Sequence, residues 1–247
     1  MENNENIIAA RQTKTVYREG NKCIKGFGKE FTKSDVLNEA LSQSRVEETG
    51  LKIPKILDVT EINGMWSIVS EFIEGKTLSA LMKEYPEKRE EHLNLLVDLQ
   101  IEVHSKSNNL LIKLRDKLHR EICASEVDAT TRYDLHARLE GMPKHNKICH
   151  GDFCPSNITI TDDGTPYIVD WSQVSQGNAS GDAAWSYLTL CMSWGEECAE
   201  RYLDLFCEKG SFDKRYVRRW MPIMAAARLS LEKHEEREFL LKWSNVI

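Results

Sequence analysis

The chain has 247 residues, with 33 lysines and arginines against 39 aspartates and glutamates, and a net charge of −6 at pH 7. This acidic balance argues against a general nucleic-acid-binding protein. The sequence lacks a run of the roughly 20 apolar residues that a membrane helix needs, and its polar residues 1–6 are unlike a signal peptide. Seven scattered cysteines without a Cys-x-x-Cys pair favour a reducing environment over a disulfide framework or structural zinc. We therefore expect a cytoplasmic protein with no nucleic-acid or membrane partner.

The first third of the sequence is predicted to be rich in β-strands. Residues 16–25 have the pattern of two short strands joined by a turn, and residues 33–44 have the apolar spacing of a helix. Extended segments are predicted at 52–59 and 61–73, and the second contains an Asn63-Gly64 turn. These elements predict a small antiparallel sheet that is accompanied by one helix.

From Thr77 onward the chain is predicted to be mostly helical. Thr77 follows a break at Glu74-Gly75 and is placed as the N-cap of the next helix. One face of a later amphipathic helix carries Leu93, Leu96, Val97, Ile101 and His104. Three more amphipathic helices are predicted near the end of the chain, at 196–208, 214–231 and 235–243.

The segment from Cys149 to Trp171 holds the residues most typical of a chemical function. Residues 158–161 alternate between isoleucine and threonine, a period of two that predicts a strand. Residues 162–166 form a turn cluster with an Asp-Gly pair, and residues 167–169 predict a second strand. The segment is therefore expected to form a β-hairpin.

Such a hairpin returns the chain to its starting point, so Asn157 before it and Asp170 after it are predicted to be neighbours. An amide oxygen and a carboxylate suit a Mg²⁺ ion that keeps some of its water. Asp152 lies in the loop before the first strand, where it can approach a substrate hydroxyl. Each residue alone is common in turns. Their order and spacing together match the needs of phosphoryl transfer from a metal-bound nucleotide.

The stretch His150-Gly151-Asp152-Phe153-Cys154-Pro155-Ser156-Asn157, followed by Ile168-Val169-Asp170-Trp171, resembles the catalytic and metal-binding segments of the aminoglycoside phosphotransferase / choline kinase family. The resemblance implies an α+β, two-lobed protein-kinase-like fold. Residues 1–74 would form a small antiparallel β-sheet lobe that covers the nucleotide. Residues 75–247 would form a mostly helical lobe with the catalytic loop and the acceptor-substrate site.

The resemblance also implies roles for the residues of this segment. Asp152 is the catalytic base or the carboxylate that orients the substrate hydroxyl, and Asn157 and Asp170 hold Mg²⁺. His150 braces the catalytic loop and does not transfer protons. Asp182, near the start of a later predicted helix, supports the active-site loops.

Two further residues are assigned to the nucleotide phosphates. Lys25, at the end of a predicted strand, resembles the family's lysine that meets the α- and β-phosphates. Glu39, on the helix predicted at 33–44, is its expected acidic partner, and Glu30 or the Glu47-Glu48 pair are the alternatives.

The segment Glu71, Phe72 and Ile73, followed by Gly75, resembles the interlobe hinge of the family. The resemblance implies that the backbone of these three residues hydrogen-bonds the adenine edge and that Gly75 bends the chain. Ile160 is placed among the nucleotide contacts as well.

The loop expected to cover the phosphates departs from the kinase pattern. Residues 8–15 contain no glycine, and the hydroxyls of Thr13 and Thr15, with backbone amides, are expected to take the place of a glycine-rich loop.

The sequence thus predicts an enzyme: a phosphotransferase that moves the γ-phosphate of Mg²⁺-bound ATP, with GTP as the alternative donor, to a hydroxyl of an aminoglycoside-like or amino-alcohol substrate. Two features bear on the acceptor. Acidic residues suit a polycationic aminoglycoside but are also typical of solvated helices (Glu196, Glu197, Glu200, Glu235 and Glu236). Tryptophans suit a quaternary ammonium but are also typical of a core (Trp171, Trp185, Trp194 and Trp220).

Two rival functions and the oligomeric state stay open. A catalytically silent, kinase-like nucleotide-binding or scaffold protein is supported by the glycine-free loop. A protein kinase is disfavoured because no Ala-Pro-Glu-type segment follows Asp170.

Overall fold

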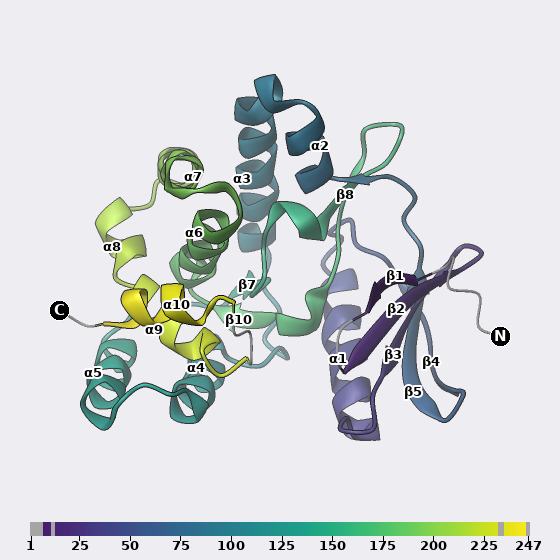
Figure 1. Cartoon of the computed structure of the whole chain (residues 1–247), viewed down its shortest axis with the longest axis horizontal. Coiled ribbons are helices and arrows are strands. Elements are labelled where there is room, and N and C mark those ends of the chain that lie inside the picture. The colour runs from purple at the N-terminus through teal and green to yellow at the C-terminus, as the bar shows by residue number, and fades with distance from the viewer. Residues whose placement is uncertain (1–6, 11–12, 232–234, 246–247) are drawn as a thin grey trace. The chain divides into compact units, whose positions relative to one another are not determined.

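The computed structural model describes residues 7–10, 13–231 and 235–245, which fold into two compact units (Figure 1). The first unit comprises the chain up to Leu81 together with Ser156–Ser172, and the second comprises Met82–Pro155 and the chain from Gln173 onward. From the sequence, the boundary between the two parts was expected between residues 74 and 75. The hairpin after Ser156 belongs to the first unit because its strand β8 (Ile158–Ile160) pairs with β6 (Lys76–Thr77).

The first unit is built on a five-stranded antiparallel sheet in the order β1-β2-β3-β5-β4. Its strands are β1 Ile7–Ala10, β2 Lys14–Glu19, β3 Lys22–Phe27, β4 Ile56–Ile62 and β5 Met65–Glu71. Asn63 and Gly64 between β4 and β5 both have positive φ, 53° and 76°, the conformation that matches the twist of a two-residue hairpin. The predicted strand–turn–strand in residues 16–25 and the Asn63-Gly64 turn are confirmed.

Helix α1 (Lys33–Glu47) packs on this sheet and places Glu39. Its start is fixed by a capping box, in which the Thr32 side chain accepts from the Asp35 N–H and the Asp35 carboxylate accepts from the Thr32 N–H. Val36 and Ala40 of α1 are buried in one cluster with residues of β3 and β5. The burial of this face fixes the rotation of the helix about its axis.

A second, three-stranded sheet in the order β6-β8-β9 carries the predicted hairpin, with β9 at Pro166–Ile168. Ile158 pairs with Ile168, and the Val169 N–H donates to the Asn157 carbonyl at 2.9 Å. The pairing of β8 with β9 confirms the hairpin and brings the backbone of Asn157 next to Val169. The Thr77 hydroxyl accepts from the Ala80 N–H at 3.1 Å, which confirms Thr77 as the cap of α2 (Leu78–Glu84).

The second unit is mostly helical. Its helices are α3 Arg89–Ser105, α4 Leu114–Ala124, α5 Ala129–Glu140, α6 Ala179–Trp194, α7 Glu196–Gly210, α8 Lys214–Arg218, α9 Met221–Arg228 and α10 Arg237–Ser244. Two short strands, β7 (Lys147–Cys149) and β10 (Ser175–Gly177), pair antiparallel. The single helix predicted at 214–231 is wrong. Pro222, in the first turn of α9, has no N–H with which to continue the hydrogen-bond ladder of α8.

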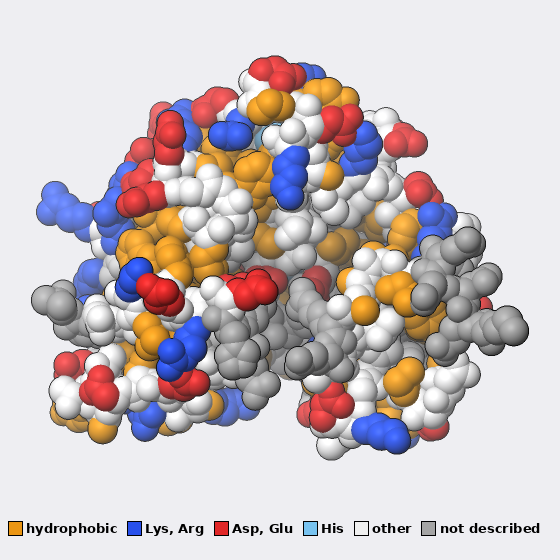
Figure 2. All heavy atoms as spheres, in the orientation of Figure 1, with side chains coloured by type: hydrophobic (Ala, Val, Ile, Leu, Met, Phe, Trp, Pro, Cys, Tyr) orange, Lys and Arg blue, Asp and Glu red, His pale blue; other side chains and the backbone are white. Residues whose placement is uncertain are grey.

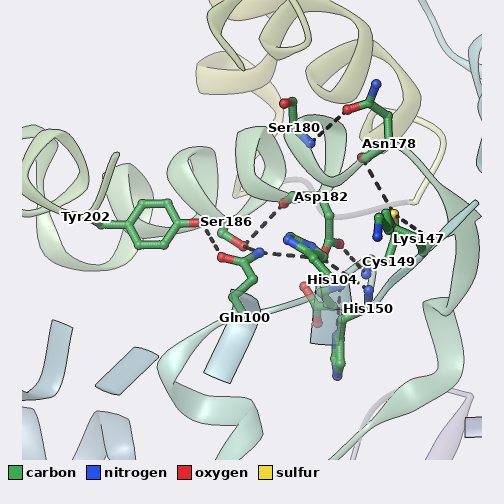
Figure 3. Close-up of polar contacts among 12 residues, drawn as sticks. Gln100, His104, Lys147, Cys149, His150, Asn178, Ser180, Asp182, Ser186 and Tyr202 are labelled. Carbon is green, nitrogen blue, oxygen red and sulfur yellow. Dashed lines mark hydrogen bonds and ion pairs between the residues drawn. The ribbon is translucent and has the colours of Figure 1, made fainter. Parts of the chain in front are cut away.

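A buried polar network lies in the core of the second unit (Figure 3). The carboxylate of Asp182 on α6 is 2.9 Å from His104 Nε2 and accepts from Gln100 Nε2 at 3.4 Å, both on α3. Gln100 also donates to the Ser186 hydroxyl at 3.0 Å and accepts from the Tyr202 hydroxyl. Burial raises the pKa of Asp182, but the hydrogen bond and charge of His104 outweigh it and hold this pKa below its ordinary value.

Helix α4 carries a partly buried ionisable pair, Lys117 and Glu121, whose side chains are 16% and 18% exposed. Lys117 donates to the backbone oxygen of Gln173 at 2.7 Å and to its side-chain oxygen at 2.8 Å, and Glu121 lies 3.9 Å away. Burial lowers the pKa of Lys117 to about 8, although the charge of Glu121 acts in the opposite direction. Burial also raises the pKa of Glu121.

Lysine and arginine side chains are interspersed with aspartate and glutamate over the face seen in Figure 2. Among the residues that the structure describes, no helix has both the length and the apolar character needed to cross a membrane.

Replacing Asp182 by Asn should lower the free energy of unfolding by on the order of 3 kcal/mol, because the buried network loses its charged acceptor. Urea unfolding near neutral pH measures this loss. The exposed Asp98, which pairs with Lys209 at 2.7 Å in the same unit, provides a matched control, since Asp98→Asn should cost less than about 1 kcal/mol. Because the pKa of Asp182 is lowered in the fold, its contribution should fade as the pH falls below 3.8. Equal losses in the two variants would contradict the assignment.

The pH dependence of the stability of Lys117→Met tests whether this partly buried lysine has a lowered pKa. In the folded protein the amine loses its proton above about pH 8, whereas in the unfolded chain it keeps the proton up to about 10.5. The unfolded state therefore binds more protons in this window, and the wild type should gain stability relative to Lys117→Met by roughly 1.4 kcal/mol per pH unit at most. Paired urea titrations at several pH values across the window measure this slope. A pH-independent difference would show that the amine is not desolvated.

Candidate active site

Lys25, Glu39 and Asp170 form an ion-pair cluster in the first unit. The Lys25 ammonium, on β3, lies 2.7 Å from Glu39 Oε1 and 3.0 Å from Asp170 Oδ1. Burial alone lowers the pKa of Lys25, but the two carboxylates outweigh it and raise this pKa above its ordinary value. The predicted Lys25–Glu39 pair is confirmed. The alternative Glu47 is engaged elsewhere, since its carboxylate accepts from the Ile56 N–H at 2.8 Å.

Asp170 has an unusual backbone conformation. Its φ is 59°, in the left-handed region that residues other than glycine rarely adopt. The flanking structure holds it there, because the Val169 N–H is bonded to Asn157 and the indole of the buried Trp171 donates to the Ile168 carbonyl at 2.9 Å. Backbone strain of this kind gathers at functional sites, where the surrounding structure over-determines it.

Lys14 is a second cation at Glu39 that the sequence analysis missed. Its ammonium lies 3.0 Å from Glu39 Oε2, so the two carboxylate oxygens bind one lysine each. It also lies 4.8 Å from the ring centroids of Phe27 and Phe31, close enough for cation–π attraction. The sequence contained only a weak signal for this contact, because it depends on the register of β2 against β3.

The glycine-free loop is described only in part. Arg11 and Gln12 lie outside the described residues. On either side of them, Thr15 pairs with Ala10 and the Thr13 carbonyl accepts from the Gly28 N–H at 2.8 Å. The roles expected for the Thr13 and Thr15 hydroxyls stay predictions.

The hinge segment is tied to the sheet of the first unit. The Glu71 N–H donates to the Lys55 carbonyl at 3.0 Å, and the Phe72 N–H donates to the Asn21 carbonyl at 2.9 Å. The guanidinium of Arg18 lies 4.1 Å from the ring centroid of Phe72. These contacts hold the segment before Ile73 in an extended conformation.

Gly75 connects this segment to the hairpin of the same unit. It has a φ of 156°, and a Cβ at this position would lie 2.2 Å from the carbonyl oxygen of Ile160. A side chain is therefore excluded by close backbone approach. Ile160 is half-buried and pairs with Lys76 directly after Gly75.

In the second unit, Asp152 is held by side chains from two helices. The Trp185 indole on α6 donates to Asp152 Oδ1 at 3.1 Å, and the Arg228 guanidinium at the end of α9 lies 3.5 Å from the same oxygen. The Asp152 N–H donates to His150 Nδ1 at 3.1 Å, which accords with a bracing role for that histidine. Arg228 was not foreseen, because no local pattern relates it to a loop 76 positions earlier in the chain.

Asp182 binds the backbone of the loop that carries Asp152 (Figure 3). Its carboxylate accepts from the Gly151 N–H at 2.7 Å and from the His150 N–H at 3.2 Å. Gly151 has a φ of 80°, and a Cβ there would lie 2.4 Å from the Gln173 carbonyl oxygen. The loop therefore requires glycine before Asp152, and Asp182 holds that glycine in place.

The candidate metal ligands fit a hard cation in kind. Asn157 and Asp170 supply an amide oxygen and a carboxylate, and the Val169–Asn157 hydrogen bond sets their backbones side by side. Within the described parts of the chain, no group of three or more His, Cys, Asp or Glu side chains is arranged to hold a metal. Mg²⁺ in phosphoryl-transfer sites commonly takes one or two protein oxygens and completes its shell with phosphate and water.

Comparison with known proteins agrees with this architecture. The model of the phosphotransferase enzyme family matches residues 32–220. A search among curated protein sequences gives no significant match.

Three solved structures illustrate the similarity of fold. An aminoglycoside-3'-phosphotransferase of type VIII is 18% identical, with a TM-score of 0.63 over 87% of this chain and 90% of that one. The apo form of a thermostable mutant of aminoglycoside phosphotransferase APH(4)-Ia is 16% identical, with a TM-score of 0.69 over 96% and 90%. The choline kinase LicA from Streptococcus pneumoniae is 14% identical, with a TM-score of 0.64 over 95% and 86%. The predicted α+β, kinase-like fold is thereby confirmed. Because the family model covers more than half of the 247 residues, the chain belongs to the phosphotransferase enzyme family.

Proposed function

We propose that the protein moves the γ-phosphate of Mg²⁺-bound ATP, with GTP as the alternative donor, to a hydroxyl of an aminoglycoside-like or amino-alcohol substrate. The observation that carries the proposal is the position of Lys25, whose ammonium is shared between Glu39 and Asp170. Two neighbours in fold support the choice of ligands. One is described as a ternary complex of APH(4)-Ia with ADP and hygromycin B, and another is a choline kinase.

On the donor side, Lys25 would bind the α- and β-phosphates. The carboxylates around it raise its pKa, so the amine stays protonated at neutral pH and presents a full positive charge. Glu39 would fix this amine in place. When Lys25 binds phosphate oxygens, its contact with Asp170 is the one that yields, which leaves that carboxylate for the metal.

The nucleotide base would be bound by the hinge through fewer backbone N–H groups than the sequence implied. The N–H groups of Glu71 and Phe72 already donate to carbonyls of the protein. We therefore assign the donor for the adenine edge to the backbone of Ile73, with the carbonyls of the segment as acceptors. Ile160 would supply apolar contact to the base.

Asn157 and Asp170 would hold the Mg²⁺ ion, which when bound neutralises charge on the phosphates. Asp152 would accept the hydrogen bond of the acceptor hydroxyl. As that oxygen bonds to the γ-phosphorus, the bond to the β–γ bridging oxygen breaks and the proton passes to the Asp152 carboxylate. This distribution of roles is typical of kinases, in which positioning and electrostatics provide most of the catalysis.

One of the acidic residues and three of the tryptophans that were considered for the acceptor are engaged within the protein. Glu200 lies 2.9 Å from Lys214 and 2.7 Å from Arg218, so it offers less attraction to a polycation than its charge implies. Trp171, Trp185 and Trp220 are buried. The acceptor must therefore be identified by a screen of aminoglycosides and amino alcohols.

A catalytically silent scaffold is the rival function. It is disfavoured because an ion pair between the phosphate lysine and the helix glutamate accompanies a catalytic-loop aspartate that is held by Trp185. A thermal-shift assay with ATP discriminates between the two functions, because an enzyme of the proposed kind should be stabilised more with Mg²⁺ than without it.

Asp152→Asn should reduce kcat by about 10²- to 10⁴-fold, because the amide accepts no proton from the hydroxyl. The nucleotide affinity should stay within about threefold of wild type, since Asp152 is assigned to the acceptor. Steady-state kinetics with the best acceptor from the screen measures both quantities. Unchanged kcat in this variant would remove Asp152 from the mechanism.

Lys25→Met and Glu39→Gln should each weaken the binding of Mg-ATP by roughly tenfold or more, because a charge-assisted contact to phosphate contributes about 1.5–3 kcal/mol. Isothermal titration calorimetry measures the affinity. Lys22→Met is the matched control, since this exposed lysine lies on the same strand and should leave affinity unchanged. If the three variants bind nucleotide alike, Lys25 is not the phosphate lysine.

A further inference from the structure

Asp152 is held by two side chains, Arg228 and Trp185, neither of which the sequence analysis connected with this aspartate. Arg228 is 9% exposed and lies at the end of α9, and Trp185 is 1% exposed on α6. The Arg228 guanidinium is centred 3.8 Å from the Trp185 ring centroid. A planar guanidinium at this distance stacks on an indole face and keeps its N–H groups available at its edge.

The edge of that guanidinium faces the catalytic loop. Arg228 Nη2 donates to the Gly151 carbonyl and lies 3.5 Å from Asp152 Oδ1. The Trp185 indole N–H donates to the same carboxylate oxygen at 3.1 Å. One oxygen of Asp152 thus faces two donors, and both donors are themselves fixed by stacking on each other.

One side chain from α6 and one from α9 hydrogen-bond to the two backbone polar groups of Gly151. Asp182 accepts from the Gly151 N–H at 2.7 Å, and Arg228 donates to the Gly151 carbonyl. Trp185 lies three residues after Asp182, so both side chains project from the same face of α6. The peptide that leads into Asp152 is therefore held at its N–H, at its carbonyl and at the following carboxylate.

Burial of Arg228 has a cost that needs an explanation. Desolvation lowers the pKa of this guanidinium, and the charge of Asp152 is the largest effect in the opposite direction. A buried charge is unfavourable unless it is paired and hydrogen-bonded. A hydrophobic side chain of similar length would pack α9 without this cost, so the arginine is better explained by its contacts to the loop.

We propose that Arg228 and Trp185 are positioning residues for phosphoryl transfer, which fix the side-chain torsion of Asp152 and hold its carboxylate against the acceptor hydroxyl. This inference rests on the proposed role of Asp152. A carboxylate fixed by two donors suits a reaction in which orientation of the hydroxyl matters more than early removal of its proton. The stacked guanidinium also covers one face of Trp185, so that face is not offered to a substrate ammonium.

Three variants separate the contributions. Arg228→Met keeps the length of the side chain but removes its charge and donors. Arg228→Lys keeps the charge and loses the planar pair of donors. Trp185→Phe keeps a ring for stacking and loses the indole N–H. Arg115→Met is the matched control, because Arg115 in the same unit also donates to a backbone carbonyl (Met142) and pairs with a carboxylate (Glu140), away from the catalytic loop.

In steady-state kinetics with an active acceptor, the three variants should lower kcat and leave the KM values nearly unchanged. We expect about a 10- to 100-fold decrease in kcat for Arg228→Met, since a misplaced catalytic group costs up to about this much. Arg228→Lys should recover part of the loss, and Trp185→Phe should fall between Arg228→Lys and wild type. The KM values for nucleotide and acceptor should stay within about threefold of wild type in all three. Equal kcat in Arg228→Met and Arg115→Met would overturn the proposal.

A spectroscopic measurement tests the contact without any activity. In ¹⁵N-labelled protein, the indole N–H resonance that disappears in Trp185→Phe belongs to Trp185. It should move in Arg228→Met, in Arg228→Lys and in Asp152→Asn, and it should stay in place in Arg115→Met. An unmoved resonance in the two conservative variants, Arg228→Lys and Asp152→Asn, would overturn the proposed contacts of Trp185 with Arg228 and Asp152 even if Arg228→Met fails to fold.

The two readouts separate this inference from the proposed function. If wild type transfers phosphate to none of the acceptors, the proposed function fails. The indole resonance still decides whether Trp185 contacts Arg228 and Asp152. If wild type is active and Arg228→Lys and Trp185→Phe keep full kcat, the positioning role fails while the proposed function stands.

Discussion

The buried carboxylate of Asp182 is the constraint on which the second unit depends. It is 1% exposed, and it joins α3 through His104 and Gln100, α6 through its own backbone, and the loop before Asp152 through Gly151. A carboxylate without water must satisfy its oxygens with donors from the protein. Here the donors come from two parts of the chain that are far apart in sequence, α3 and the loop of His150 and Gly151, so satisfying one side chain also fixes the loop that carries Asp152.

In the first unit the charges are reversed, because a partly exposed cation lies between two carboxylates. Lys25 is 20% exposed and sits between Glu39 and Asp170. Its partners come from a helix whose rotation is set by core packing and from a strained residue that follows a hairpin. The proposed chemistry would need such a site to exchange partners, because phosphate oxygens and a metal would replace contacts within the protein. A fully buried triad of this kind would resist the exchange.

Local patterns were sufficient to predict the residues that share a strand, a turn or a helix. The hairpin around Asp162–Pro166, the Asn63-Gly64 turn and the cap at Thr77 each depend on a few adjacent residues, and all three are present in the structure. The pairing of Lys25 with Glu39 was reached through family resemblance. The break between α8 and α9 was visible in the sequence at Pro222, but the amphipathic pattern on either side concealed it.

Contacts that depend on tertiary packing were not predictable in the same way. Arg228 approaches Asp152 across 76 positions of sequence, and Lys14 reaches Glu39 across 25. Nothing in the neighbourhood of either residue distinguishes it from an ordinary surface cation. Similarly, the engagement of the Phe72 N–H by Asn21 follows from how the β2–β3 hairpin meets the hinge, which no periodicity encodes.

Phosphorus NMR tests the central claim of phosphoryl transfer to a small-molecule hydroxyl most directly. The protein is incubated with Mg-ATP, and in parallel with Mg-GTP, and each member of an acceptor panel of aminoglycosides, choline and other amino alcohols. We expect that one acceptor yields a phosphate monoester resonance that is coupled to protons on the acceptor carbon, in amounts equal to the nucleoside diphosphate formed. Formation of inorganic phosphate alone, or an unchanged triphosphate with every acceptor, would contradict it.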